Sequence, residues 1–205
     1  IDTSATTGKT VDVLLTGGAL TLNNDVTTNT TGNVLLTAAT GISEAGAAKI
    51  TTDTVGLNVT GAGNIVTNNS NVVNVLGAKT ANGNVQFKNT QNLGVTTVGA
   101  SGNFAGTTNG IDTSTTTGKT VDVLLTGGAL TLNNDVTTNT TGNVLLTAAT
   151  GISEAGAAKI TTDTVGLNVT GAGNIVTNNS NVVNVLGAKT ANGNVQFKNT
   201  QALGI

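Results

Sequence analysis

Carboxylates are the side chains of this sequence with the clearest capacity for chemistry. Two of them on either side of a glycosidic bond can hydrolyse it. The chain contains no histidine or cysteine, its eight basic residues are all lysines, and tryptophan and tyrosine are missing. Enzymes that cleave polysaccharides usually also need basic and aromatic residues that hold the sugar. We therefore expect no enzyme and no catalytic residue, and expect the acids Asp2, Asp12, Asp25, Glu44 and Asp53 to be solvated.

A phosphate-binding loop is suggested by Gly8-Lys9-Thr10, which has the form of that motif's end. The motif also needs a glycine five residues before its second glycine. Thr3 occupies that position, and Thr113 occupies the matching position later in the chain. The sequence therefore predicts an ordinary lysine on a turn before a strand at 11–15, and no cofactor.

Calcium is the metal that Asn24-Asp25 and Asp53 could in principle bind. Calcium needs six to eight oxygen ligands, and isolated carboxylates do not supply them. The sequence has neither an EF-hand loop nor a Gly-Gly-x-Gly-x-Asp repeat. We expect no metal site, with a structural calcium as the alternative.

Threonine pairs and glycosylation patterns leave two further alternatives. Thr28-Asn29-Thr30 and Thr52-Asp53-Thr54 could order water if they lined up on a flat face. The uneven spacing of the apolar segments described below argues against such a grid. Asn29, Asn58 and Asn68 begin Asn-x-Ser/Thr patterns, which occur by chance in a chain this rich in Asn and Thr.

Composition excludes several classes of protein. Charged residues make up 9% of the chain and the net charge is −2, so no basic patch for nucleic acid exists. No apolar run approaches the roughly 20 residues of a membrane-spanning helix. Hydrophobic residues nevertheless make up 37% of the chain, and threonine and valine favour β-strands. An ordered all-β chain with many turns is expected.

The chain consists of two copies of one repeat. Residues 1–95 align with 111–205 at an offset of 110, and only three pairs differ: Ala5 with Thr115, Asn92 with Ala202, and Val95 with Ile205. We interpret 1–110 as a first repeat of about five coils and 111–205 as a second, truncated repeat. Together they should form one continuous solenoid, cut from an array that continues in both directions. The two copies should share one strand register, with their differences concentrated at the chain ends.

A shorter period lies inside each repeat. Five apolar segments begin at Val13, Val34, Leu57, Val73 and Leu93, and the spacings through to the next repeat average 22 residues. Their alternation predicts strands with one buried face. Gly-Asn pairs between them predict corners, because both residues tolerate positive φ. The residues expected to point inward are Val13, Leu15, Val34, Leu36, Leu57, Val59, Val73, Val75, Val85, Phe87, Leu93 and Val95.

Together these features predict a parallel β-solenoid, or β-helix, with coils of about 22 residues and no long helix. The alternative is a string of tandem β-sandwich repeats of roughly 100 residues each. In the solenoid, the asparagines of Asn23-Asn24 and Asn68-Asn69-Ser70-Asn71 could stack as amide ladders at the corners.

The segments Gly32–Ile42 and Val55–Ile65 resemble the repeat regions of large bacterial adhesins, in particular filamentous-haemagglutinin-like exoproteins of two-partner secretion. The resemblance implies a right-handed parallel β-helix, export to the extracellular space or cell surface, and a stalk or filament role. The alternative function is a repeat that itself binds carbohydrate or cells. Expected partners are neighbouring repeats or further copies of the chain, with host-cell or matrix glycans as a further option. With no capping coil recognisable, the coil near Leu203 should pair with the coil near Val11 of the next molecule.

Overall fold

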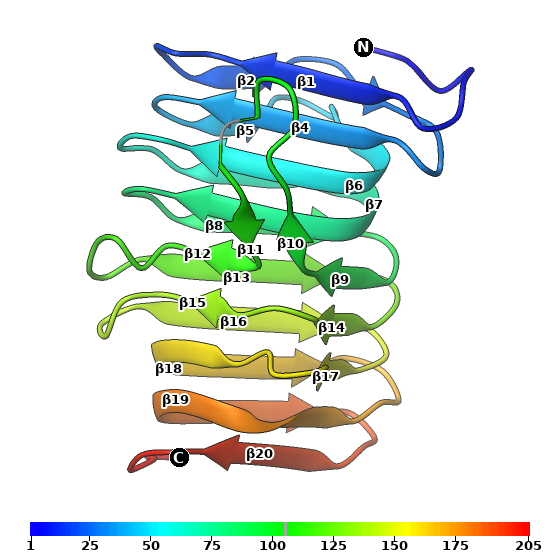
Figure 1. Ribbon diagram of the computed structural model, residues 1–205. Coiled ribbons are helices and arrows are strands. Elements are labelled where there is room, and N and C mark those ends of the chain that lie inside the picture. The colour runs from blue at the N-terminus through cyan, green and yellow to red at the C-terminus, as the bar shows by residue number, and fades with distance from the viewer. Residues whose placement is uncertain (105) are drawn as a thin grey trace.

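The chain is an all-β solenoid of about nine turns, each of roughly 21 residues (Figure 1). The computed structural model describes residues 1–104 and 106–205, and no helix occurs among them. Neighbouring strands pair in parallel, and the pairs stack along the solenoid axis. The N-terminus lies at the top of Figure 1 and the C-terminus at the bottom. The predicted fold class is confirmed, and tandem antiparallel sandwiches are excluded.

Every coil contributes strand to two broad sides of the solenoid. We call the side that begins with β1 the first side and the side that begins with β2 the second side. The first side contains, from top to bottom, β1 (Thr10–Leu14), β4 (Asn33–Ala38), the later parts of β6 (Ile50–Val59) and β7 (Ile65–Thr80), β9 (Leu93–Val95), β12 (Ile111–Asp112), β14 (Leu130–Leu132), β15 (Val136–Thr137), β17 (Ile152–Glu154), the early parts of β18 (Ile160–Val169) and β19 (Ile175–Thr190), and β20 (Val195–Asn199).

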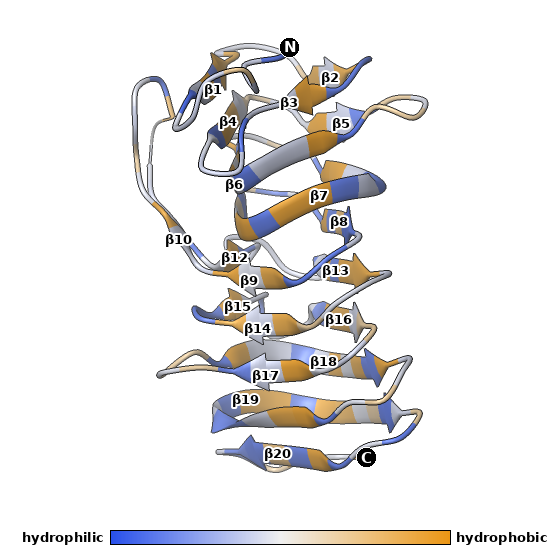
Figure 2. Cartoon of the chain, turned by 90° about the vertical axis from the view of Figure 1, so that its right-hand side faces the viewer, coloured by the Kyte–Doolittle hydropathy of each residue, from blue (hydrophilic) through white to orange (hydrophobic). Residues whose placement is uncertain are grey.

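The second side contains β2 (Leu20–Leu22), β3 (Val26–Thr27), β5 (Ile42–Glu44), the early parts of β6 and β7, β8 (Val85–Asn89), β13 (Thr120–Leu125), β16 (Asn143–Ala148), and the later parts of β18 and β19. Apart from these, β10 (Thr97–Val98) and β11 (Thr108–Asn109) form an antiparallel hairpin. Figure 2 shows that this hairpin runs alongside the stacked coils.

Strand register is the same in both copies. Thr10 faces Asn33 as Thr120 faces Asn143, and the pairs of β2 with β5, β4 with β6 and β6 with β7 are repeated in the same way. The expected equivalence of the two copies is therefore confirmed for their strand pairing.

The second copy begins on the opposite side of the solenoid from the first. β1 lies on the first side, whereas its counterpart β13 stacks on β8, with Val121 facing Val85. The chain reaches that position because it leaves the stack after β9, makes the β10–β11 hairpin, and re-enters the first side as β12 before it turns to the second. Each repeat thus advances the stack by about four and a half coils and turns it by half a revolution.

The core is a continuous column of valine, leucine and isoleucine between the two sides. Residues alternate in β4, where Val34, Leu36 and Ala38 are completely buried in this column. Val13 and Leu15 pack against the column but are only partly buried, because the first coil has no neighbour above it. Their counterparts Val123 and Leu125 lie in the middle of the stack and are buried.

The predicted inward position of Val75 is wrong. β7 bends between its two parts at Asn74, where the pairing with β6 is interrupted between Thr52–Val73 and Thr54–Val75. The bend shifts the phase of the alternation, so Leu76 and Ala78 point into the core and Val75 faces outward. The other interior positions of the expected set, from Val34 to Val95, do lie in the core.

Two buried asparagines hold the corners, but their amides bond to backbone atoms and do not stack on each other as the expected amide ladder. Asn71 and Asn89 face each other in register and are fully buried. Each bonds to the backbone of the preceding coil: the Asn71 Oδ1 accepts from the Ile50 N–H at 2.6 Å, and the Asn89 amide exchanges two bonds with Val73 at 2.9 and 3.0 Å. These amides replace strand pairing where the chain bends.

Candidate functional site

The predicted carboxylates accept hydrogen bonds from backbone or side-chain groups of their own or a neighbouring coil. Asp2 accepts from the Ser4 N–H at 2.8 Å, and the side chain of Ser4 together with this N–H lowers the pKa of Asp2. Asp25 accepts from the Lys49 N–H at 3.1 Å. Asp53 accepts from the Asn74 side-chain amide at 2.9 Å. The hydrogen bonds of Asp25 and Asp53 thus join neighbouring coils.

Glu44 is a half-buried carboxylate of the first copy. Its Oε2 accepts from the Asn69 N–H at 2.9 Å, while its Oε1 is buried without a hydrogen-bond partner. Burial raises the pKa of Glu44, although the bond from Asn69 opposes the shift. Glu154 repeats this arrangement with Asn179 in the second copy.

Asp12 has a partner that sequence reasoning missed. Its Oδ2 accepts from the backbone N–H of Asn103, which lies in the β10–β11 hairpin 91 residues further along the chain. The counterpart Asp122 faces no such hairpin, and burial raises the pKa of its carboxyl group.

The other candidate motifs are also structural parts of the corners. Gly8 has a φ of 66° and donates its N–H to Thr31 at 2.9 Å, and the strand that follows is Thr10–Leu14, as the turn interpretation predicts. Thr28 and Thr52 are buried and joined through their hydroxyls at 2.6 Å. They point into the coil rather than forming an exposed threonine grid.

The three glycosylation patterns differ in accessibility. The Asn68 side chain is exposed, whereas Asn29 is half-buried and donates its amide to the Ser4 carbonyl at 3.1 Å. Asn58 is 8% exposed. Asn68 is thus the most accessible acceptor of the three.

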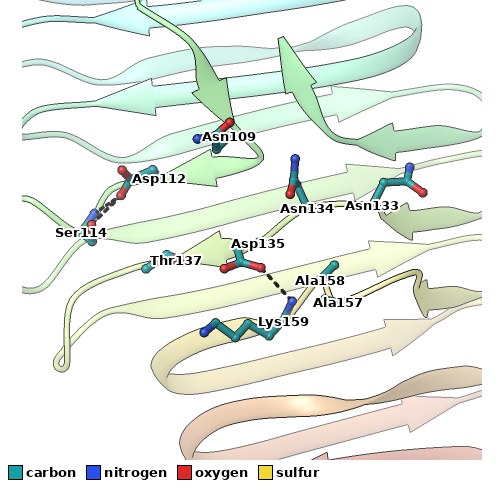
Figure 3. A pocket seen from close by; sticks show the side chains of 10 residues that line it. All are labelled: Asn109, Asp112, Ser114, Asn133, Asn134, Asp135, Thr137, Ala157, Ala158 and Lys159. Carbon is teal, nitrogen blue, oxygen red and sulfur yellow. Dashed lines mark hydrogen bonds between the residues drawn. The ribbon is translucent and has the colours of Figure 1, made fainter. Parts of the chain in front are cut away.

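A polar hollow of about 650 Å³ lies at the junction of the two copies (Figure 3). We call it the junction hollow. It is lined by hydroxyl, amide, carboxylate and ammonium groups together with two alanines. Its lining residues are Asn109, Asp112, Ser114, Asn133, Asn134, Asp135, Thr137, Ala157, Ala158 and Lys159.

Hydrogen bonds fix the walls of the junction hollow. Asp112 Oδ1 accepts from the Ser114 N–H at 2.9 Å and from its hydroxyl at 2.6 Å. Asp135 accepts from the Lys159 N–H at 3.1 Å, as Figure 3 shows. The Asn134 amide donates to the Thr97 hydroxyl of the β10–β11 hairpin.

The first copy supplies part of the junction hollow. Asn109 comes from the first repeat and all other lining residues come from the second, so the hollow is completed where one repeat meets the next. The sequence carries no signal for it, because Thr97 and Asn134 are brought together only by the stacking of coils 37 residues apart. Such a surface can form hydrogen bonds with a polar ligand.

Within residues 1–104 and 106–205, no three acidic side chains gather closely enough to hold a metal ion, and no helix is long and apolar enough to cross a membrane. Comparison of the chain with known protein families, with curated proteins and with solved structures finds no match.

Proposed function

We propose that this chain is a structural segment, a stalk or filament unit, of a secreted or cell-surface bacterial adhesin. The observation that supports this proposal is the junction between the two copies. β13 continues the stack on β8 through five parallel pairs, from Val121–Val85 to Leu125–Asn89, without a break in the ladder. A repeat that stacks on its own copy in this way can lengthen a rod without a linker, and each added coil buries more apolar surface.

The ends of the rod are open for further stacking. Val85 is completely buried under β13, whereas its counterpart Val195 in the last coil is 45% exposed. β20 and β1 each have one unpaired edge, and an unpaired edge recruits strands. We propose that further copies of the chain stack there with the register of the internal junction, which places Val195 against Val11 and Leu203 against Leu20.

Electron microscopy of chains with two, four and six copies tests the rod. Each added copy should lengthen it by about 22 Å, which is four and a half coils at about 4.8 Å each. A chain of separate beads, or a length that does not rise in proportion to the number of copies, would contradict the proposal.

Light scattering of the present chain tests end-to-end stacking. Mass should rise with concentration, and Val195→Lys should prevent the rise, because a charge would be buried at the new junction. Thr131→Lys, on the side of the rod, is the matched control and should leave assembly intact. Assembly that survives Val195→Lys would show that the chains associate elsewhere.

A second candidate function is binding of carbohydrate on host cells or matrix, and the junction hollow favours it. Its open, polar lining presents hydroxyl, amide and carboxylate groups, the groups that bond to sugar hydroxyls. Binding of the chain to a glycan array should then be lost with Asp135→Asn. Asp25→Asn is the matched control, since Asp25 makes the same bond to Lys49 in the first copy, where no counterpart of Asn109 is present.

A further inference from the structure

The β10–β11 hairpin covers the outer surface of the first copy. Phe104 and Val98 form a small apolar cluster with Leu35 of β4, and Val75 packs against it. Phe104 is 1% exposed and Leu35 is 2% exposed, although Leu35 points away from the core. The cluster is separate from the core column, so the hairpin is an added outer layer, visible beside the stack in Figure 2.

Two glycines make room for this layer. A Cβ at Gly56 would lie 2.8 Å from Phe104, and a Cβ at Gly77 would lie 2.8 Å from Val98. Neither glycine has a positive φ, so close approach of the hairpin, and not backbone conformation, explains them.

The same surface of the second copy is bare. Leu145 is 42% exposed and Val185 is 44% exposed, although they match Leu35 and Val75. The glycines are repeated as well: a Cβ at Gly187 would meet nothing closer than 4.0 Å. An open groove of about 510 Å³ remains there, which we call the bare groove. It is lined by Asp122, Leu145, Thr147, Gly166, Leu167, Asn168, Gly187, Ala188 and Lys189.

The polar anchor of the hairpin is repeated too. In the first copy, Asp12 accepts the Asn103 N–H near the hairpin tip. In the second copy, Asp122 lines the bare groove at the corresponding place. The bare groove therefore has the same features that contact the hairpin in the first copy. Asp122 is a hydrogen-bond acceptor, Leu145 is an apolar surface, and Gly166 and Gly187 have no side chains.

We propose that the bare groove is the docking site of another hairpin with the sequence of residues 96–110, joined to the chain directly after Ile205. The hairpin of the first copy leaves the stack just after β9, where Gly94 pairs with Val75. Gly204 pairs with Val185 in the same way, so Ile205 lies where such a hairpin must start. A hairpin attached there reaches the bare groove by the path that the first hairpin follows.

Single cysteines test this proposal cleanly, because the chain has no cysteine of its own. We would place cysteine at Leu145 or Val185, and at the covered counterparts Leu35 or Val75, and measure the rate of reaction with a thiol reagent. In the 205-residue chain the two bare positions should react at least about tenfold faster than the covered ones, since reaction at a covered site requires the hairpin to open.

Extending the chain by a copy of residues 96–110 should then slow the reaction at Leu145→Cys and Val185→Cys by the same factor. Alanine in place of the phenylalanine in the added hairpin should restore fast reaction. An extension that leaves both rates unchanged, or an alanine variant that remains protected, would overturn the proposal. Protection of Leu145→Cys in the unextended chain that grows with protein concentration would also overturn it, because a second molecule would then occupy the groove.

Discussion

Leu35 and Leu145 lie in the same six-residue strand sequence, with the same strand register, yet one is 2% exposed and the other 42%. The difference comes entirely from the β10–β11 hairpin, which covers only the first copy. Val85 and Val195 show the same contrast at the end of the stack, where one has a coil below it and the other does not. In a solenoid, the burial of a residue depends on which coil or hairpin is its neighbour, and local sequence alone does not determine it.

Phenylalanine to alanine at the two equivalent core positions should give the largest contrast. Phe87 is 1% exposed in the middle of the stack, whereas Phe197 in the last coil is half-buried. Phe87→Ala should cost about 3–5 kcal/mol of unfolding free energy, the usual cost of a large core cavity. Phe197→Ala should cost clearly less, because the last coil can fray alone. Urea unfolding followed by circular dichroism measures both, and equal losses would contradict the role of the neighbouring coil.

Phe104→Ala should make the first copy resemble the second. Without the ring, the hairpin loses most of its apolar contact with Leu35 and should detach while the coils remain folded. Hydrogen exchange at the amides of β10 and β11 should become at least about tenfold faster. Exchange in β16 and β18 serves as the control and should not change. A global loss of protection would mean that the hairpin supports the whole stack.

Alanine at the paired glycines should give a smaller contrast. Gly77→Ala places a methyl group against Val98 and Thr108, so it should displace the hairpin at a cost of about 1–3 kcal/mol. Gly187→Ala meets open space and should change stability by less than about 0.5 kcal/mol. Thermal unfolding of the two variants measures the difference. Equal effects would mean that the glycines serve the strands and not the hairpin.

The half-buried glutamates Glu44 and Glu154 should give the smallest contrast, because both copies contain the same site. Burial raises the folded-state pKa of Glu44 and Glu154 above that of an unfolded glutamate. The folded state then binds more protons, so stability is greatest below the unfolded pKa and falls as pH rises through the raised folded pKa. Glu44→Gln and Glu154→Gln should each flatten this fall equally in urea titrations between acidic and neutral pH. A variant that steepens the fall would contradict the sign of the shift.

Much of the fold follows from sequence because the apolar alternation survives wherever a strand is straight. Val34, Leu36 and Phe87 were expected in the core for this reason and lie there. The alternation fails at Val75, because a corner at Asn74 shifts its phase. Leu35 points outward and is buried only because the hairpin, 61 or more residues later in the sequence, covers it. Nothing in the strand that contains Leu35 predicts this burial.

The candidate surfaces were harder to predict than the fold. The junction hollow needs Asn109 of one copy beside Asn134 of the next, and this proximity depends on the half-revolution between copies. The 110-residue repeat gives no indication of that rotation, because an estimate of about five coils per repeat does not reveal a half-coil offset. The rotation arises from the path of residues 96–110, which leave the stack and return to it on the side they left.

That half-revolution has a mechanical consequence. A hairpin layer on one side of a rod adds contacts on that side only. A rod with every hairpin on the same side would therefore curve. Successive repeats of this sequence carry their hairpin positions on opposite flanks, since β1 and β13 lie on opposite sides. The bending contributed by one repeat is therefore cancelled by the next, and orientation is restored after nine coils, or about 43 Å. A long array of these repeats would therefore remain straight, although each repeat has a hairpin on one flank only.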